Sequence, residues 1–213
     1  MIKSVVRDKS NRQAISWGLH LGQRWGAWTQ SIWQLGYGQL LHQLPIARDA
    51  AVRILEIGCG RGDHLMRFAG HFVNAQLVGL EAALPTVVEA QQRTQPYSNR
   101  IDVYHSIYEG VGPPMMASFD VLLLPYQLSQ TATWQTQLEQ AYHDLRPGGI
   151  IAVMDYYKDP IGIVQRKFFH RKPLANTLLP VLEARFAPLS VDVYHAYAGL
   201  WQYFSFVGIK PYD

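Results

Sequence analysis

The chain has 213 residues, of which 48% are hydrophobic and only 16% are charged, and its formal net charge is +3. This length fits one domain with a sizeable core, and the lack of a long lysine and arginine run argues against a dedicated nucleic-acid groove. The single cysteine, Cys59, excludes an internal disulfide and favours a reducing, cytoplasmic location. No stretch of about 18 apolar residues is present, so we expect no membrane-spanning helix.

The first fifty residues differ in pattern from the rest of the chain. Residues 1–13 are polar and are expected to be loose. In the segment that follows, apolar residues recur at spacings of three and four, which predicts a helix with one apolar face. These residues are Trp17, Leu21, Trp25, Trp28, Ile32 and Leu35. We therefore treat residues 1–50 as a Trp-rich helical extension, which would pack on the core, close over a site as a lid, or lie at a membrane surface.

From residue 53 onward, strand and helix patterns alternate. The expected strands are 53–57, 75–81, 101–106, 119–124 and 150–155, and the expected helices are 62–72, 84–94, 131–145 and 173–186, the last kinked or split by Pro180. Two β-rich runs, 188–197 and 201–209, then follow with no helix between them. The pattern predicts an α/β domain over residues 51–213. We expect a Rossmann-like, seven-stranded, mostly parallel sheet with helices on both faces and an antiparallel C-terminal edge hairpin.

A glycine-rich loop follows the first of these strands, in the stretch ILEIGCGRGDHL at residues 54–65. Glycines permit positive φ and close approach of a ligand, and ligands of such sheets bind at the carboxyl ends of the strands. A dinucleotide site favours the spacing G-x-G-x-x-G, whereas here it is G-x-G-x-G with Glu56 before it and Asp63 after it. Two carboxylates disfavour a pyrophosphate and favour a ligand with a cationic, amino-acid-like end.

The pattern E-x-G-x-G-x-G resembles motif I of the class I S-adenosylmethionine (SAM) dependent methyltransferases. Glu81 ends the second strand, about twenty residues further on, where an acid binds ribose hydroxyls. The stretch LRPGGIIAVMD at residues 145–155 and the C-terminal β-rich pair are also similar to this family. The resemblance extends over roughly residues 50 to 209 and implies SAM as the cofactor.

The resemblance also implies a role for each matching residue. Glu56 would hold the ammonium of the methionine part, directly or through water, and Glu81 would bind the ribose diol through both oxygens. The family usually has an aspartate where Ser106 stands, which receives the adenine amino group, and a serine accepts that hydrogen bond more weakly. The residues expected at the cofactor are Glu56, Gly58, Cys59, Gly60, Gly62, Glu81, Ala82, Ser106, Ile107 and Pro125.

The methyl acceptor is less directly indicated. DNA and protein amine methyltransferases carry N/D-P-P-Y/F after the fourth strand, but here Leu123 cannot accept a hydrogen bond from a target amine. The stretch PYQLSQTATW at residues 125–134 resembles the betaine-lipid N-methyltransferases, which trimethylate a lipid-linked homoserine amine. The pair Asp155-Tyr156 matches an Asp-aromatic pair of the same enzymes. Quinone-modifying relatives look similar over the same stretches.

We therefore expect a methyltransferase for a small molecule or lipid headgroup, with an amine ahead of a hydroxyl. Tyr126 and Tyr156 would offer aromatic faces to a cationic amine, and Asp155 would orient the amine or accept its proton. The plainer interpretation is that the tyrosines are core residues and Asp155 caps a strand end. Further candidates for these roles are Tyr37, Tyr157, Tyr203, His64, His105 and His195. An O-methyltransferase, a quinone-modifying enzyme and a non-catalytic SAM-binding partner protein stay open.

The remaining expectations concern partners. The segment QRKFFHRKPL at residues 165–174 surrounds two phenylalanines with basic residues, which would suit an anionic lipid or substrate and allow peripheral membrane contact. No Cys/His spacing indicates a metal site, and no nucleic-acid partner is expected. The oligomeric state stays open between monomer and homodimer.

Overall fold

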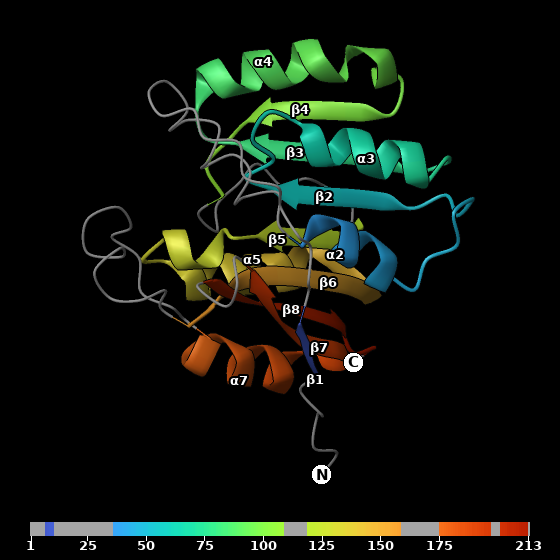
Figure 1. The fold of residues 1–213 in the computed structure, drawn as a ribbon. Helices are drawn as coiled ribbons and strands as arrows, with labels where there is room; N and C mark the ends of the chain where they lie inside the picture. Colours follow the sequence, from blue (N-terminus) through green and yellow to red (C-terminus); the bar gives the residue numbers. More distant parts are fainter. Residues whose placement is uncertain (1–6, 11–35, 109–118, 159–174, 197–200, 213) are drawn as a thin grey trace.

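The computed structural model describes residues 7–10, 36–108, 119–158, 175–196 and 201–212. Its centre is one eight-stranded sheet with the strand order β1-β7-β8-β6-β5-β2-β3-β4 (Figure 1). The strands are β1 (Arg7–Ser10), β2 (Arg53–Ile57), β3 (Gln76–Glu81), β4 (Ile101–His105), β5 (Phe119–Pro125), β6 (Leu145–Lys158), β7 (Ala187–Ala196) and β8 (Trp201–Ile209). All neighbouring strands pair in parallel except β8, which is antiparallel to both β6 and β7.

Helices cover both faces of this sheet. They are α2 (Tyr37–Gln43), α3 (Asp63–His71), α4 (Leu84–Thr94), α5 (Trp134–Asp144) and α7 (Ala175–Arg185), with short 3-10 turns η1 (Gln95–Tyr97) and η2 (Leu128–Gln130). Helices α2, α3 and α4 pack into one hydrophobic core and α5 and α7 into the other. Alternate residues of the central strand β5 pack into the two cores. Val121 and Leu123 lie in the first core, and Leu122 and Leu124 lie in the second. The Rossmann-like, mostly parallel sheet with a C-terminal antiparallel pair is thus confirmed.

The strand order reverses beside β2. From β2 the chain continues outward to β3 and β4, and it then returns to place β5 and β6 on the opposite side of β2. The loops that leave β2 and β5 therefore diverge, which opens a crevice at the carboxyl ends of these strands. This crevice is the place where the fold favours a ligand.

The structure corrects one expectation and narrows another. Residues 7–10, expected to be loose, form β1 and give the sheet an eighth strand, because β7 would otherwise leave an unpaired edge that an extended segment can cover. Helix α7 continues through Pro180, so of the two alternatives the split is excluded, and a kink at Pro180 stays a prediction. Pro180 is exposed, and the buried Leu178 and Leu182 on either side of it hold the helix against the sheet.

Some expectations fall outside the described residues. These include the Trp-rich segment up to residue 35 and the basic segment 165–174. The division of the chain at residue 50 stays a prediction, although Leu40 and Leu44 of the first part are buried in the core. Within the described ranges, no helix combines the length and the apolar character needed to cross a membrane.

Candidate active site

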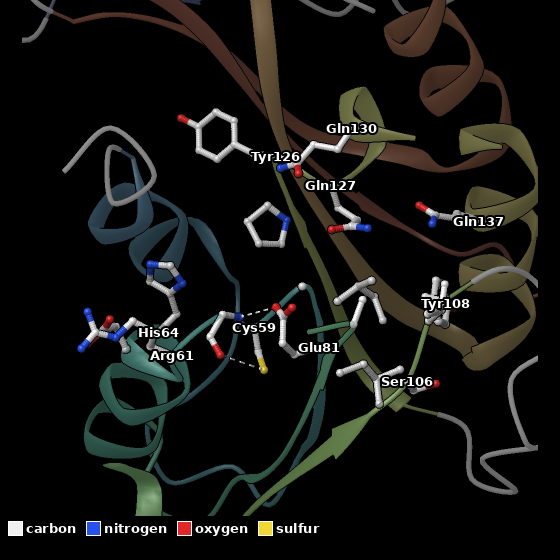
Figure 2. A pocket seen from close by; sticks show the side chains of 18 residues that line it. Cys59, Arg61, His64, Glu81, Ser106, Tyr108, Tyr126, Gln127, Gln130 and Gln137 are labelled. Carbon is white, nitrogen blue, oxygen red and sulfur yellow. Dashed lines mark hydrogen bonds between the residues drawn. The ribbon is translucent and has the colours of Figure 1, made fainter. Parts of the chain in front are cut away.

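A cavity of about 480 Å³ lies at the crevice between β2 and β5. Its walls come from the loop after β2, the ends of β3 and β4, and the segment from Pro125 to Gln137 (Figure 2). Its volume is within the range of small-molecule sites. Of the residues expected at the cofactor, all but Glu56 and Gly62 line this cavity, namely Gly58, Cys59, Gly60, Glu81, Ala82, Ser106, Ile107 and Pro125.

The glycines of the loop after β2 expose backbone to the cavity. Gly58, Gly60 and Gly62 have φ values of 72°, 54° and 78°, which L residues rarely adopt. A Cβ atom added to Gly60 would meet nothing within 4 Å, so this backbone is open to a ligand. A Cβ atom on Gly62 would lie 2.8 Å from Thr94 Cγ2, so that glycine lets α3 approach α4. The loop therefore serves both ligand access and helix packing.

The Glu81 carboxylate is held at the edge of the cavity by backbone donors. Oε2 accepts a hydrogen bond from the Gly60 N–H at 3.1 Å, and Oε1 accepts one from the Ala83 N–H at 2.9 Å. A carboxylate has about four lone-pair sites, so both oxygens keep capacity for a ligand. The open backbone of Gly60 and this fixed double acceptor fit the amino-acid part and the ribose diol of SAM.

Glu56 lies behind the cavity wall. Its carboxylate is fully buried, and Oε1 lies 3.1 Å from Nδ1 of His64, which itself lines the cavity. The role of Glu56 at the cofactor ammonium stays a prediction. His64, expected to be structural more often than functional, is the residue that the structure places between this carboxylate and the cavity.

An ion pair fixes the loop to α4. Arg93 donates from Nη1 to Asp63 Oδ2 at 3.0 Å and from Nη2 to Asp63 Oδ1, and Nη1 also reaches the Arg61 carbonyl at 3.3 Å. Burial pushes the pKa of Asp63 up, but the hydrogen bonds and charge of Arg93 outweigh it, so the pKa lies below its ordinary value of 3.8. The pair therefore stabilises the folded loop when Asp63 is ionised.

We expect this stabilisation to disappear in acid. Because the pKa of Asp63 is lowered on folding, the contribution is present above the unfolded value of 3.8 and is lost as the pH falls through the folded value. Asp63→Asn should lower the melting temperature at pH 7 by at most about 2–4 °C, as for a solvent-screened pair, and the deficit should shrink below pH 4. Thermal melts between pH 7 and pH 3 measure it, with Asp102→Asn as an exposed control. A deficit that does not change with pH would contradict this.

Tyr126 occupies an unusual backbone conformation at the end of β5. Its φ is 51°, which is the one positive value at a non-glycine residue in the described ranges. Two hydrogen bonds hold this conformation: the Tyr126 N–H donates to the Met154 carbonyl at 2.6 Å, and Gln130 Nε2 donates to the Tyr126 carbonyl at 2.5 Å. Such strain costs about 1–3 kcal/mol and is typical of functional sites. Tyr126 lines the cavity as expected.

The other residues expected at the acceptor lie behind Tyr126. The rings of Tyr156 and Tyr203 lie 5.2 Å and 6.3 Å from its ring, and neither residue lines the cavity. Asp155 is fully buried, where Oδ2 accepts from the Ser129 N–H and Oδ1 from the Tyr156 N–H, both at 2.8 Å. These contacts match the plainer interpretation of Asp155, in which it caps the end of a strand. The catalytic roles of Asp155 and Tyr156 stay predictions.

The remaining candidates are placed as follows. Tyr157 and His195 do not line the cavity, and His105 is engaged with the Ala82 carbonyl at 2.9 Å. Tyr37 begins helix α2, but its side chain is not among those that the structure describes. Burial, with Glu56 and Glu81 nearby, raises the pKa of the Cys59 thiol well above its ordinary range, which disfavours the reactive thiolate. Among the described residues, no cluster of His, Cys, Asp and Glu could hold a metal ion.

Sequence reasoning missed several residues of the cavity wall. Tyr108 reaches it from the loop after β4, and three glutamines, Gln127, Gln130 and Gln137, reach it from the segment after β5. Glutamines have no distinctive pattern in a sequence. The position of the stretch PYQLSQ directly after a central strand was the available signal for Gln127 and Gln130.

Comparison with known proteins gives consistent results. Residues 55–151 match a family described as a methyltransferase domain. The chain is 24% identical over 160 residues to the demethylmenaquinone methyltransferase of Thermus thermophilus, covering 69% of each protein. The crystal structure of the [4+2]-cyclase SpnF has a TM-score of 0.72 and 20% identity, covering 94% of this chain and 89% of that one. The N-methyltransferase NodS of Bradyrhizobium japonicum, bound to S-adenosyl-L-homocysteine (SAH), has a TM-score of 0.67 and 19% identity, covering 82% and 85%. These two structures support the fold.

Proposed function

Since this chain is a class I SAM-dependent methyltransferase, we propose that it methylates an amine nitrogen of a small molecule or lipid headgroup held beside Tyr126. The cofactor, when bound, supplies an electrophilic methyl group on a sulfonium. Glu81 would accept hydrogen bonds from the ribose diol, and the open backbone at Gly60 would admit the methionine part. These assignments leave the end of β5 as the wall that faces the acceptor.

The observation that carries the acceptor class is the position of Tyr126. Tyr126 is part of the cavity wall, beside the neutral amides of Gln127 and Gln130 (Figure 2), and its buried ring packs against the rings of Tyr156 and Tyr203. Methylated amines are cations, which aromatic faces attract, and amide oxygens can accept hydrogen bonds from amine N–H groups. Chemistry would then rest on alignment and desolvation of the amine more than on a strong base.

The charges at the cavity support a cationic acceptor. Glu81 and Asp63 contribute negative charge to the wall, whereas Arg61 is paired with Glu89 and Asp63 with Arg93. Glu81 is thus the carboxylate at the cavity that lacks a cationic partner among the described residues. A cavity of this charge favours an amine over an anionic acceptor.

A quinone ring is the second candidate. The Thermus relative is named as a demethylmenaquinone methyltransferase, and the cavity wall includes the apolar side chains of Ile57, Leu80 and Pro125. Such an acceptor would use the same cofactor site and would need a base for its hydroxyl proton. His64 is the histidine that the described wall offers for that purpose.

A methyl-transfer assay with labelled SAM tests the proposal against amines, amino-acid headgroup analogues, phenols and quinols. We expect amine products, and Tyr126→Leu should lower kcat/KM for the amine by roughly tenfold while Tyr126→Phe retains most of it. SAH affinity should stay unchanged in both variants, and thermal melts would verify folding. Products from quinols alone would support the second candidate. SAH binding without product from any acceptor would favour the non-catalytic partner protein.

A further inference from the structure

Gln137 is a polar side chain buried in the cavity wall. It lies on α5 with 3% of its surface exposed, and its Oε1 atom has no hydrogen-bond partner among the described residues. The neighbouring apolar residues Trp134, Leu138 and Ala141 pack this helix into the core. A buried amide oxygen without a partner is destabilising, and Gln137 could be replaced at this position by an apolar residue of similar size. A ligand in the cavity would supply the missing hydrogen bond.

The surroundings of Gln137 indicate which part of a ligand lies there. Figure 2 shows Gln137, Tyr108 and Ser106 on one side of the cavity and His64 and Arg61 on the other, with Glu81 between them. The Tyr108 hydroxyl is already committed, because it donates to Asp144 at 2.6 Å. Among the described residues that line the cavity, the side near Gln137 therefore offers an amide, a hydroxyl and an aromatic ring but no charged side chain, whereas the other side carries Arg61 and Asp63.

A SAM molecule has the matching asymmetry. Its methionine end carries an ammonium and a carboxylate, its adenine end is uncharged, and the ribose joins the two. With the ribose at Glu81 and the charged end along the glycine loop, the base would lie on the side of Gln137. An adenine edge presents an amino donor beside a ring-nitrogen acceptor, and a glutamine amide pairs with such an edge through both its atoms.

We infer that Gln137 is the residue that recognises the adenine base, with Oε1 accepting a hydrogen bond from the 6-amino group and Nε2 donating to the adjacent ring nitrogen. This assignment rests on SAM as the cofactor of this cavity and is independent of the methyl acceptor. It gives the site a second polar contact to the base beside Ser106, which accepts a hydrogen bond more weakly than a carboxylate.

The test compares SAH with S-inosyl-L-homocysteine, in which oxygen replaces the adenine amino group, by calorimetric titration. The wild type should bind SAH at least roughly tenfold more tightly, because the analogue leaves the buried amide unsatisfied. Gln137→Leu should reduce that ratio to roughly twofold, mainly by weaker SAH binding. Gln135→Leu, an exposed glutamine on the same helix, should leave the ratio unchanged.

Thermal melts separate recognition from a structural role. Leucine is similar in size and removes an unpartnered oxygen, so Gln137→Leu should melt at or above the wild-type temperature, and Gln137→Met serves as a second variant. The inference is overturned if Gln137→Leu keeps the wild-type ratio, or if it weakens both nucleosides equally. If the wild type binds neither nucleoside, the cofactor site itself is misplaced and the proposed function fails with it.

Discussion

Replacement of Glu81 by alanine is expected to weaken SAH binding by roughly a hundredfold or more, because two charge-assisted hydrogen bonds to the ribose diol are lost. The carboxylate is already oriented by the N–H groups of Gly60 and Ala83, so it needs no rearrangement to accept a diol. Alanine also removes the link between the end of β3 and the glycine loop. Titration calorimetry with SAH measures the effect directly.

Two further variants sharpen this test. Glu81→Gln keeps the shape and one acceptor oxygen but loses the charge, so an intermediate loss of roughly tenfold is expected. Glu139→Ala removes an exposed carboxylate on α5 outside the cavity wall and should leave the affinity unchanged. If Glu81→Ala binds SAH as the wild type does, with an unchanged melting temperature, the cofactor does not occupy this cavity.

The strands of the central sheet could be predicted because their mostly apolar residues indicate that they are buried. β5 has apolar residues along almost its whole length, as a parallel strand covered on both faces requires. β1 could not be predicted in this way, because its residues RDKS are polar and only the open edge of β7 gives them a partner. Local chemistry left a kink and a split open at Pro180, and the packing of the buried Leu178 and Leu182 favours a helix that is not split.

In the candidate site, too, some features could be predicted from the local sequence and others depend on tertiary packing. The glycine loop and Glu81 follow from local chemistry, since spacing and residue type alone indicate a backbone open to a ligand and an acid after the next strand. The contacts that orient these groups join residues far apart in the sequence, such as Asp63 with Arg93. Nothing near Tyr126 in the sequence signals a φ of 51°, and nothing near Gln137 signals a buried amide. Such features arise only when several elements pack together.

Gly62→Ala is expected to be the most destabilising single-methyl change in the glycine loop. Its φ of 78° would strain an alanine by about 1–2 kcal/mol, and the added Cβ atom would lie 2.8 Å from Thr94 Cγ2, which adds about 1–3 kcal/mol. The two contributions together are about 2–5 kcal/mol, so the melting temperature should fall by roughly 4–20 °C. Thermal denaturation of the purified variant measures this fall.

Thr94→Ser in the Gly62→Ala background separates the two causes, because it removes the clashing Cγ2 atom and keeps the hydroxyl that donates to the Ala90 carbonyl at 2.9 Å. The double variant should regain the steric part of the loss and retain the backbone strain. Gly60→Ala should cause a smaller fall in melting temperature, because its Cβ atom meets nothing within 4 Å, but it should bind SAH more weakly. Equal losses of stability in Gly60→Ala and Gly62→Ala, with no recovery in the double variant, would show that the two glycines do not divide ligand access and helix packing between them.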